Sequence, residues 1–241
     1  MNENFEKTLE KIKSRGYWRI NVFPNNKKQS LPIPECKELV RTSSVSLRGW
    51  DYPHIPTHND AEQEFYVIDK RIESWIDWHL FKEVWRFYCN GQFVHFFGML
   101  DDWYEDDPML VNTRYQTVKP GEAMDVLGLL FRLTEIYSFI KNLSANPIYD
   151  DGINIEISLC NTKNRKLVLL DTSRVPLSCE YKNFNDNIIL QKKLVSPKES
   201  EDNFKKFALE DAKHIYQQFQ WENPPISNFE EDQNKLIERR I

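Results

Sequence analysis

Two aromatic runs on either side of Asn90-Gly91 constrain the fold of this chain more than any other feature of its sequence. Residues 84–89 and 92–97 are rich in β-branched and aromatic side chains, which favour β-strands. An Asn-Gly pair between two such runs predicts a β-hairpin with a two-residue turn. Counting outward from this turn pairs Arg86 with His95.

The expected pairing divides the hairpin into two faces, because successive side chains of a strand point to opposite sides. One face would carry Trp85, Phe87, Val94 and Phe96, and the other Arg86, Tyr88, Phe93 and His95. Both sets contain aromatic rings, which bury a large apolar area. We therefore predict that the hairpin is covered on both faces.

The most apolar segment of the chain, Ala123–Leu143, also contains Asp125, Arg132, Glu135 and Lys141. Charges at these positions make the segment a poor membrane span and favour a central core helix.

Hydrophobic periodicity and turn residues predict the remaining elements. Helices are expected at residues 3–14, 34–42, 198–219 and 229–239. Strands are expected at residues 17–23, 43–47, 65–68, 74–80, 153–159, 166–170, 178–182 and 188–195, of which the last four form two further hairpins. A helical turn is the alternative for residues 74–80. We predict a single α+β domain over residues 1–241: a largely antiparallel, meandering sheet packed on the central helix. The helix at 198–219 should cover the other face of the sheet or an edge, and a domain boundary near residues 110–120 is the alternative.

The composition is that of a globular protein with a net charge of −5. This charge argues against nonspecific binding to nucleic acid, which requires many phosphate-neutralising cations. The four cysteines are far apart and form no Cys-x-x-Cys pair, so we expect reduced thiols. The N-terminal segment is polar and lacks the apolar stretch of a secretory signal. We therefore predict a cytoplasmic protein that does not enter the membrane.

Residues 46–54, with the sequence Ser-Leu-Arg-Gly-Trp-Asp-Tyr-Pro-His, place ordered polar groups beside large rings. Arg48, Trp50, Asp51 and His54 are the candidate functional side chains of this corner. In one interpretation Arg48 and Asp51 form an ion pair that pins two strands. In the other, the corner is a surface for a ligand or a partner.

The hairpin face with Arg86 and His95 is expected beside this corner, because the strand at 43–47 would end there. Arg86 needs an acceptor, since an unpaired buried charge is costly, and Asp51 is our candidate. We predict that Arg86 and His95 lie close to Arg48, Asp51 and His54 on one side of the sheet. An arginine beside a neutral imidazole could bind an anion or a carbonyl group. Alternatively, Arg86 pairs with Asp51 for structural reasons alone.

The sequence contains no glycine-rich phosphate loop, no Gly-x-Ser-x-Gly elbow and no His-Glu-x-x-His motif. It therefore predicts no catalytic residue, no metal ligand and no cofactor. The acidic run Asp101–Asp107 is expected to form a solvated loop, with binding of a divalent cation as the alternative. Glu156 lacks the lysine two positions later that many metal-dependent nucleases carry on the same strand.

Residues 15–19, 46–54, 85–88, 91–94 and 120–121 together resemble a family of bacterial cytosolic proteins with no assigned activity. The segments Gly-Tyr-Trp-Arg and Ser-Leu-Arg-Gly-Trp-Asp-Tyr-Pro-His carry this resemblance, which spans most of the chain. It implies a stand-alone bacterial protein of the cytoplasm and carries over no catalytic residue. A role in antiviral defence is an idea taken from this general kind of protein and not from any residue.

The leading functional hypothesis is a non-enzymatic recognition or adaptor protein that binds a protein partner or a small anionic ligand. One alternative is a metal-assisted hydrolase or nuclease that uses Asp51, Glu156 or the acidic run. Another is a single-stranded nucleic-acid-binding protein, with exposed rings as stacking platforms beside Arg19, Arg48 and Arg86. The identity of the partner and the oligomeric state stay open at this point.

Overall fold

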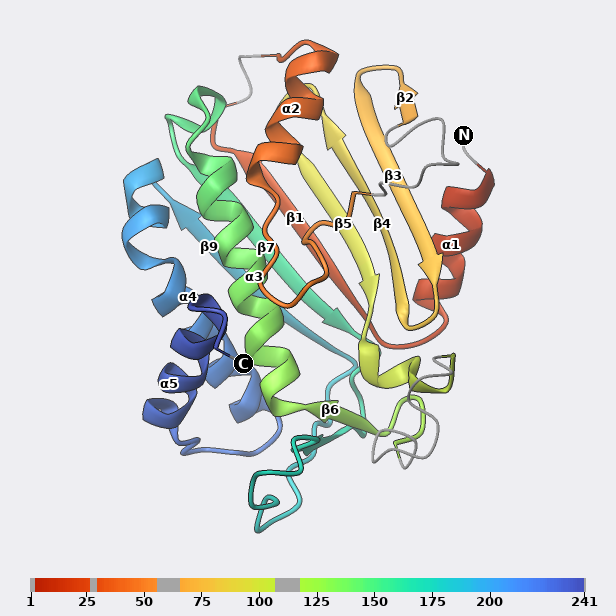
Figure 1. Cartoon of the computed structure of the whole chain (residues 1–241), viewed down its shortest axis with the longest axis vertical. Coiled ribbons are helices and arrows are strands. Elements are labelled where there is room, and N and C mark those ends of the chain that lie inside the picture. The colour runs from red at the N-terminus through yellow and green to blue at the C-terminus, as the bar shows by residue number, and fades with distance from the viewer. Residues whose placement is uncertain (1–2, 27–29, 56–65, 107–117, 241) are drawn as a thin grey trace.

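A seven-stranded antiparallel sheet forms the centre of the molecule (Figure 1). The computed structural model describes residues 3–26, 30–55, 66–106 and 118–240. In spatial order the strands are β2 (Tyr66–Ile68), β3 (Arg71–Trp78), β4 (Phe81–Tyr88), β5 (Phe93–Gly98), β1 (Tyr17–Pro24), β7 (Ile153–Cys160) and β9 (Asn187–Leu194). The predicted α+β class with a largely antiparallel sheet is confirmed.

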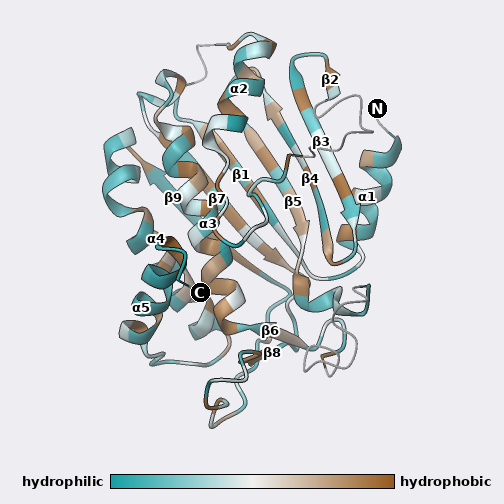
Figure 2. Cartoon of the chain, viewed as in Figure 1, coloured by the Kyte–Doolittle hydropathy of each residue, from teal (hydrophilic) through white to brown (hydrophobic). Residues whose placement is uncertain are grey.

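Helices cover both faces of this sheet. On one face lie α3 (Val126–Ser144) and α2 (Ile33–Ser43), with α4 (Pro197–Gln218) and α5 (Ile226–Ile237) beside α3 (Figure 1). On the opposite face α1 (Glu3–Lys13) packs against β3, β4 and β5. Helix α4 contacts α3 and the edge strand β9. Of the two expected positions, the other face of the sheet or an edge, it therefore occupies the edge. Figure 2 shows hydrophobic residues concentrated on α3 and on the central strands.

Helix α3 is the predicted central core helix, although it begins three residues later than expected. Residues Ala123–Asp125 form a short strand, β6, before the helix starts. Asp125 caps the helix, because its side chain accepts a hydrogen bond from the backbone N–H of Gly128 at 2.7 Å. Among the described residues, no helix has both the length and the apolar character to cross a bilayer.

The hairpin of β4 and β5 differs from the prediction by one residue. The N–H of Gly91 donates to the carbonyl of Tyr88 at 2.9 Å, and Gly91 has a φ of +82°. The loop therefore has three residues, the geometry of a turn followed by a glycine bulge. As a result Trp85 pairs with His95, and Arg86 pairs with Val94.

A one-residue shift moves every side chain of one strand to the other face. His95 consequently lies on the α3 side with Trp85 and Phe87, whereas Arg86 lies on the α1 side, where Val84 packs against α1. The predicted division into faces was wrong. The predicted coverage of both faces is confirmed, because α1 and the α2–α3 layer enclose the hairpin.

Three short predicted strands form different structures. Residues 43–47 contribute only an isolated bridge between Val45 and Tyr52. Residues Lys166–Val168 form β8, which pairs in parallel with β6 and not as a hairpin with β7. Residues 178–182 contribute only a bridge at Lys182, and the expected partner strand, β9, pairs with β7 instead.

The acidic run is solvated only in its second half, because Glu105 and Asp106 are exposed whereas the start of the run is buried. Residues Leu100–Asp102 and Tyr104–Asp106 form two short 3-10 helices, η1 and η2, and both Asp101 and Asp102 are buried. Asp107 and most of the boundary considered near residues 110–120 lie outside the described residues.

The hairpin loop yields a stability prediction. Gly91 and Gly49 both have a φ of +82°, but a Cβ on Gly91 would lie 3.0 Å from Ile148 Cδ1, whereas a Cβ on Gly49 has nothing within 4 Å. We expect Gly49→Ala to lower the free energy of unfolding by about 1–2 kcal/mol, the cost of a left-handed alanine. Gly91→Ala should cost about 1–3 kcal/mol more, because the methyl group also overpacks the loop. Equal losses in urea unfolding would contradict this account.

Candidate functional site

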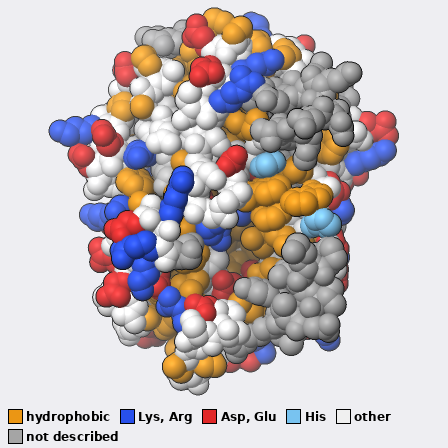
Figure 3. Space-filling view, viewed as in Figure 1, with side chains coloured by type: hydrophobic (Ala, Val, Ile, Leu, Met, Phe, Trp, Pro, Cys, Tyr) orange, Lys and Arg blue, Asp and Glu red, His pale blue; other side chains and the backbone are white. Residues whose placement is uncertain are grey.

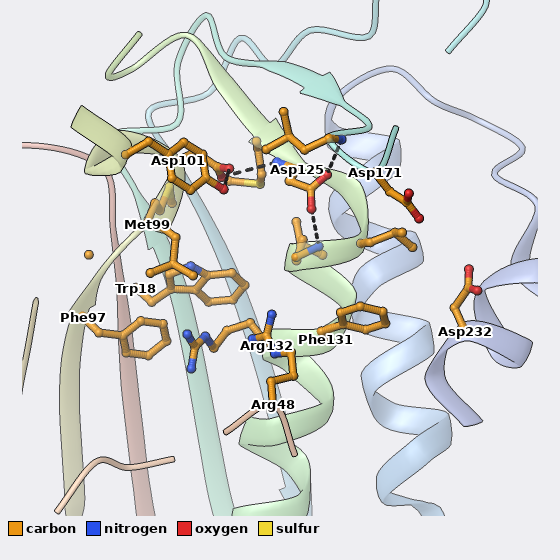
Figure 4. Close-up of a pocket in the computed structure, with 18 of the residues that line it drawn as sticks. Trp18, Arg48, Phe97, Met99, Asp101, Asp125, Phe131, Arg132, Asp171 and Asp232 are labelled. Atoms are coloured by element: carbon orange, nitrogen blue, oxygen red, sulfur yellow. Dashed lines mark hydrogen bonds between the residues drawn. The ribbon is translucent and has the colours of Figure 1, made fainter. Parts of the chain in front are cut away.

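A cavity of about 760 Å³ lies between the end of β5 and the first turns of α3 (Figure 4). This volume is in the range of small-molecule binding sites. Its walls are mostly apolar and include Trp18, Phe97, Met99, Leu127, Phe131 and Leu170. Eight charged side chains also line it. Asp171, Arg174, Asp232 and Lys235 pair with one another, and the other four are Arg48, Arg132, Asp101 and Asp125.

Arg48 and Arg132 form the cationic end of the cavity, and both pair with Glu135. Arg48 Nε and Nη2 donate to the two carboxylate oxygens of Glu135 at 2.8 Å each. Arg132 Nη1 lies 3.0 Å from Glu135 Oε2. Burial opposes the charge of Arg48, but Glu135 outweighs it and raises the pKa of Arg48. Two cations share one carboxylate, so this end keeps an excess of one positive charge.

Aromatic rings frame the cationic end. The rings of Trp18 and Phe97 are stacked, with centroids 5.8 Å apart and an interplanar angle of 12°. The guanidinium of Arg132 lies 5.1 Å from the centroid of Phe97, and that of Arg48 lies 5.7 Å from the centroid of Phe131. Contacts of this length allow cation–π attraction, which orients both guanidinium groups.

Asp101 and Asp125 form an acidic end. Asp101 accepts hydrogen bonds from Tyr104 Oη at 3.0 Å and from the N–H of Asp125 at 3.3 Å. Asp125 accepts from the N–H groups of Gly128 and Leu170 (Figure 4). Burial, together with the negative charge of Asp125, raises the pKa of Asp101 to about 7. Burial also raises the pKa of Asp125.

A second polar centre lies under the corner at residues 46–54. Glu83 accepts hydrogen bonds from Trp50 Nε1 at 3.0 Å, from the N–H of His54 at 3.3 Å and from His95 Nε2 at 2.8 Å. Burial alone would raise the pKa of Glu83, but the contacts with His95, Trp50 and His54 together outweigh it and the pKa is lowered. Burial lowers the pKa of His95, so a neutral imidazole donates to an ionised carboxylate.

Aromatic rings cover this centre toward the surface. Trp50 stacks with His54 and with Phe81, each at a centroid distance of 3.9 Å, and with Trp78 at 5.7 Å. Trp78 exposes 52% of its surface. Figure 3 shows hydrophobic side chains and histidines gathered on this side of the molecule.

The predicted cluster is correct in part. Of its members the structure brings His54 and His95 together through Glu83, which also accepts a hydrogen bond from Trp50. Arg86 is on the other face of the sheet, where it pairs with Glu73 at 3.1 Å and with Glu6 at 2.7 Å.

The proposed role of Asp51 as an ion-pair partner was wrong. Arg48 pairs with Glu135, and Arg86 pairs with Glu73 and Glu6. Within the described residues, neither arginine has an ion pair with Asp51, which is half-buried in the corner.

Two of the acids considered for metal-assisted chemistry, Glu156 and Asp102, have arginine partners. Glu156 pairs with Arg19 at 2.8 Å on β1. Asp102 and Arg165 form a buried pair with two N···O contacts of 2.5 and 2.7 Å. Over residues 3–26, 30–55, 66–106 and 118–240 there is no group of three or more His, Cys, Asp or Glu side chains that could hold a metal ion.

The sequence reasoning missed Glu83 and the part that Arg132, Glu135 and Asp101 play in the cavity. One signal was available for Arg132 and Glu135. They stand three positions apart on an apolar helix, where such side chains contact each other and a buried carboxylate requires a cation. No comparable signal marks Glu83, because its partners come from a distant loop and a neighbouring strand.

Comparisons with protein-family models, with curated proteins and with solved structures find no match to this chain.

Glu83 yields a prediction on stability. We expect Glu83→Ala to lower the free energy of unfolding by about 3–5 kcal/mol, because three buried donors lose their acceptor. Asp51→Ala is the matched control in the same corner and should change it by about 0.5 kcal/mol or less. Urea unfolding of both variants measures the difference. A larger loss for Asp51→Ala would restore our sequence-based assignment.

Asp101 yields a prediction on pH. Its pKa of about 7 in the folded state exceeds the unfolded value of about 4, so the folded state retains a proton between these pH values. Stability attributable to this group therefore falls as pH rises from 4 to 7, by about 2–4 kcal/mol in total. Asp101→Asn should remove this decline. Parallel curves of unfolding free energy against pH for the two proteins would contradict the prediction.

Proposed function

We propose that this chain is a non-enzymatic recognition protein that binds a small anionic ligand in the cavity beside α3. One observation carries the proposal. Arg48 and Arg132 share the single carboxylate of Glu135 at the wall of a cavity of about 760 Å³. An anion bound there would balance the remaining positive charge.

The remaining donors of the two arginines support this proposal. Each guanidinium group carries more N–H donors than its contacts with Glu135 use. Arginine recognises carboxylates and phosphates through such paired donors. The apolar walls around them exclude water and strengthen the attraction to an anion.

The alternatives have weaker support. Single-stranded nucleic acid would need free cations along a surface. Of the arginines considered for that role, Arg19 and Arg86 are paired with carboxylates, and Arg48 lines the cavity. A metal-assisted hydrolase would use Asp51, Glu156 or the acidic run for its ion, and of these acids Glu156 and Asp102 have arginine partners.

We also propose a cytoplasmic setting in a bacterium. The resemblance in sequence supports it, and so do the four free cysteines. An adaptor role toward a protein partner is compatible with the cavity, and the partially exposed ring of Trp78 lies on the same side of the sheet as the corner.

Matched pairs of probes test the proposal by isothermal titration calorimetry. The pairs are phenyl phosphate with phenol, indole-3-acetate with indole-3-acetamide, and adenosine monophosphate with adenosine. We expect the anionic member of at least one pair to bind about tenfold more tightly or better, because it alone meets the guanidinium groups. Arg48→Gln should abolish this preference, while Glu135 keeps Arg132 as its partner.

The control is Arg19→Gln, which removes an arginine paired with Glu156 at a distance from the cavity and should leave the preference intact. Equal binding of charged and uncharged probes would overturn the proposal, as would no binding at all. Strong thermal stabilisation of the protein by Mn²⁺ or Mg²⁺ would favour the hydrolase or nuclease instead.

A further inference from the structure

The cationic and acidic ends of the cavity are separated along α3. Asp125 is the N-cap of the helix, and Arg132 follows seven positions later on the same helical face. Seven residues correspond to about 10 Å along a helix axis. Figure 4 places Asp101 with Asp125, and Arg48 with Arg132, in separate parts of the lining.

Gly128 leaves space between the two ends. It is the third residue of α3 and lies one turn after Asp125 on the same face. The three atoms nearest to a Cβ at this position all belong to the side chain of Asp125, the closest being Oδ2 at 3.0 Å. Gly128 lines the cavity, so a larger residue there would take up part of its volume. The absence of a side chain at Gly128 therefore keeps this part of the cavity open.

The walls of this middle part suit a planar ring. The stacked pair of Trp18 and Phe97 stands on the side of β1 and β5, and Phe131 stands on the side of α3 (Figure 4). Aromatic side chains of this kind bind flat ligand rings by stacking and apolar contact.

We propose that the ligand is a nucleoside monophosphate, or a ring compound of the same plan, whose base carries an exocyclic amino group. Its anionic group meets Arg48 and Arg132, its ring lies over Gly128, and its amino group donates to the carboxylates of Asp101 and Asp125. This inference rests on the proposed function, because it assigns the anionic end to the same two arginines.

The acidic end has the capacity to accept such a donor. Each oxygen of an ionised carboxylate accepts more than one hydrogen bond, and the contacts of Asp101 and Asp125 use one per oxygen. Both carboxylates are buried beside each other, so a donor group from the ligand relieves their repulsion.

This arrangement gives the site a pH dependence of known sign. The charged and titratable groups that face Asp101 are Asp125 on β6, Tyr104 on η2 and Arg165 before β8. Asp101 loses its proton near pH 7. An amino group donates to the ionised carboxylate, so its binding tightens as pH rises from 6 to 8. A ring carbonyl accepts a hydrogen bond from the protonated form, so its binding weakens over the same range.

Adenosine monophosphate and inosine monophosphate carry the same phosphate and ribose. They differ at position 6, which is an amino group in one and a carbonyl in the other, and at N1, which carries a hydrogen only in inosine. Calorimetric titration of the full chain with both, at pH 6, 7 and 8, therefore compares how the acidic end binds the two base edges. At pH 8 we expect adenosine monophosphate to bind about tenfold more tightly. Asp101→Asn should reduce this preference and its pH dependence. Gly128→Leu should abolish binding of both nucleotides while thermal unfolding stays cooperative, because the leucine fills the middle of the cavity.

The outcomes separate this inference from the proposed function. If adenosine and inosine monophosphate bind equally at pH 8, and both exceed adenosine, the amino-group assignment is wrong and the anion site stands. The same conclusion follows if other anionic probes bind and neither nucleotide does. If no anionic probe binds, both proposals fall. The comparison in the wild-type protein requires no variant to fold.

Discussion

The carboxylate of Glu135 determines how the corner at residues 46–54 lies on the sheet. Its side chain is only 2% exposed in the middle of an apolar helix, where an unpaired charge would be strongly unfavourable. One cation, Arg132, comes from the same helix, and the other, Arg48, comes from 87 residues earlier in the chain. The second contact holds the corner against α3. Trp50 and His54, a few residues beyond Arg48, then reach Glu83 on β4.

Local sequence patterns predicted the elements that depend on local forces. Helical periodicity and caps placed α1, α2, α4 and α5 close to their observed ranges, and alternation placed β1 and β7. Helix α4 begins at Pro197, after the N-cap Ser196, one residue before the predicted start. In each case the contacts that decide the structure join residues only a few positions apart. A short stretch of sequence therefore contains both partners of the interaction.

The register of one loop could not be predicted in the same way. Asn90-Gly91 is compatible with a two-residue turn and with a three-residue loop in which Gly91 alone has a positive φ. The choice depends on tertiary packing, since Gly91 lies against Ile148 and its carbonyl accepts a hydrogen bond from Tyr149 Oη at 2.6 Å. That single residue reversed the faces of Arg86 and His95, and with them the predicted site. The parallel pairing of β6 with β8 is another contact between distant segments that no local pattern marks.

Asp101 and Asp102 show how neighbouring acids of one run acquire different roles. Asp102 is fully neutralised: Arg165 holds both oxygens, and the N–H groups of Gly16 and Gly121 donate to them as well. Asp102 thereby ties the start of β1 and the approach to β6 to one point. Asp101 has no arginine of its own among the described residues, and burial together with the charge of the neighbouring Asp125 raises its pKa. The ion pair of Asp102 thus fixes the backbone next to Asp101, whose own carboxylate has no paired cation among the described residues. As a result, an acid that titrates near neutrality lies in the wall of the cavity.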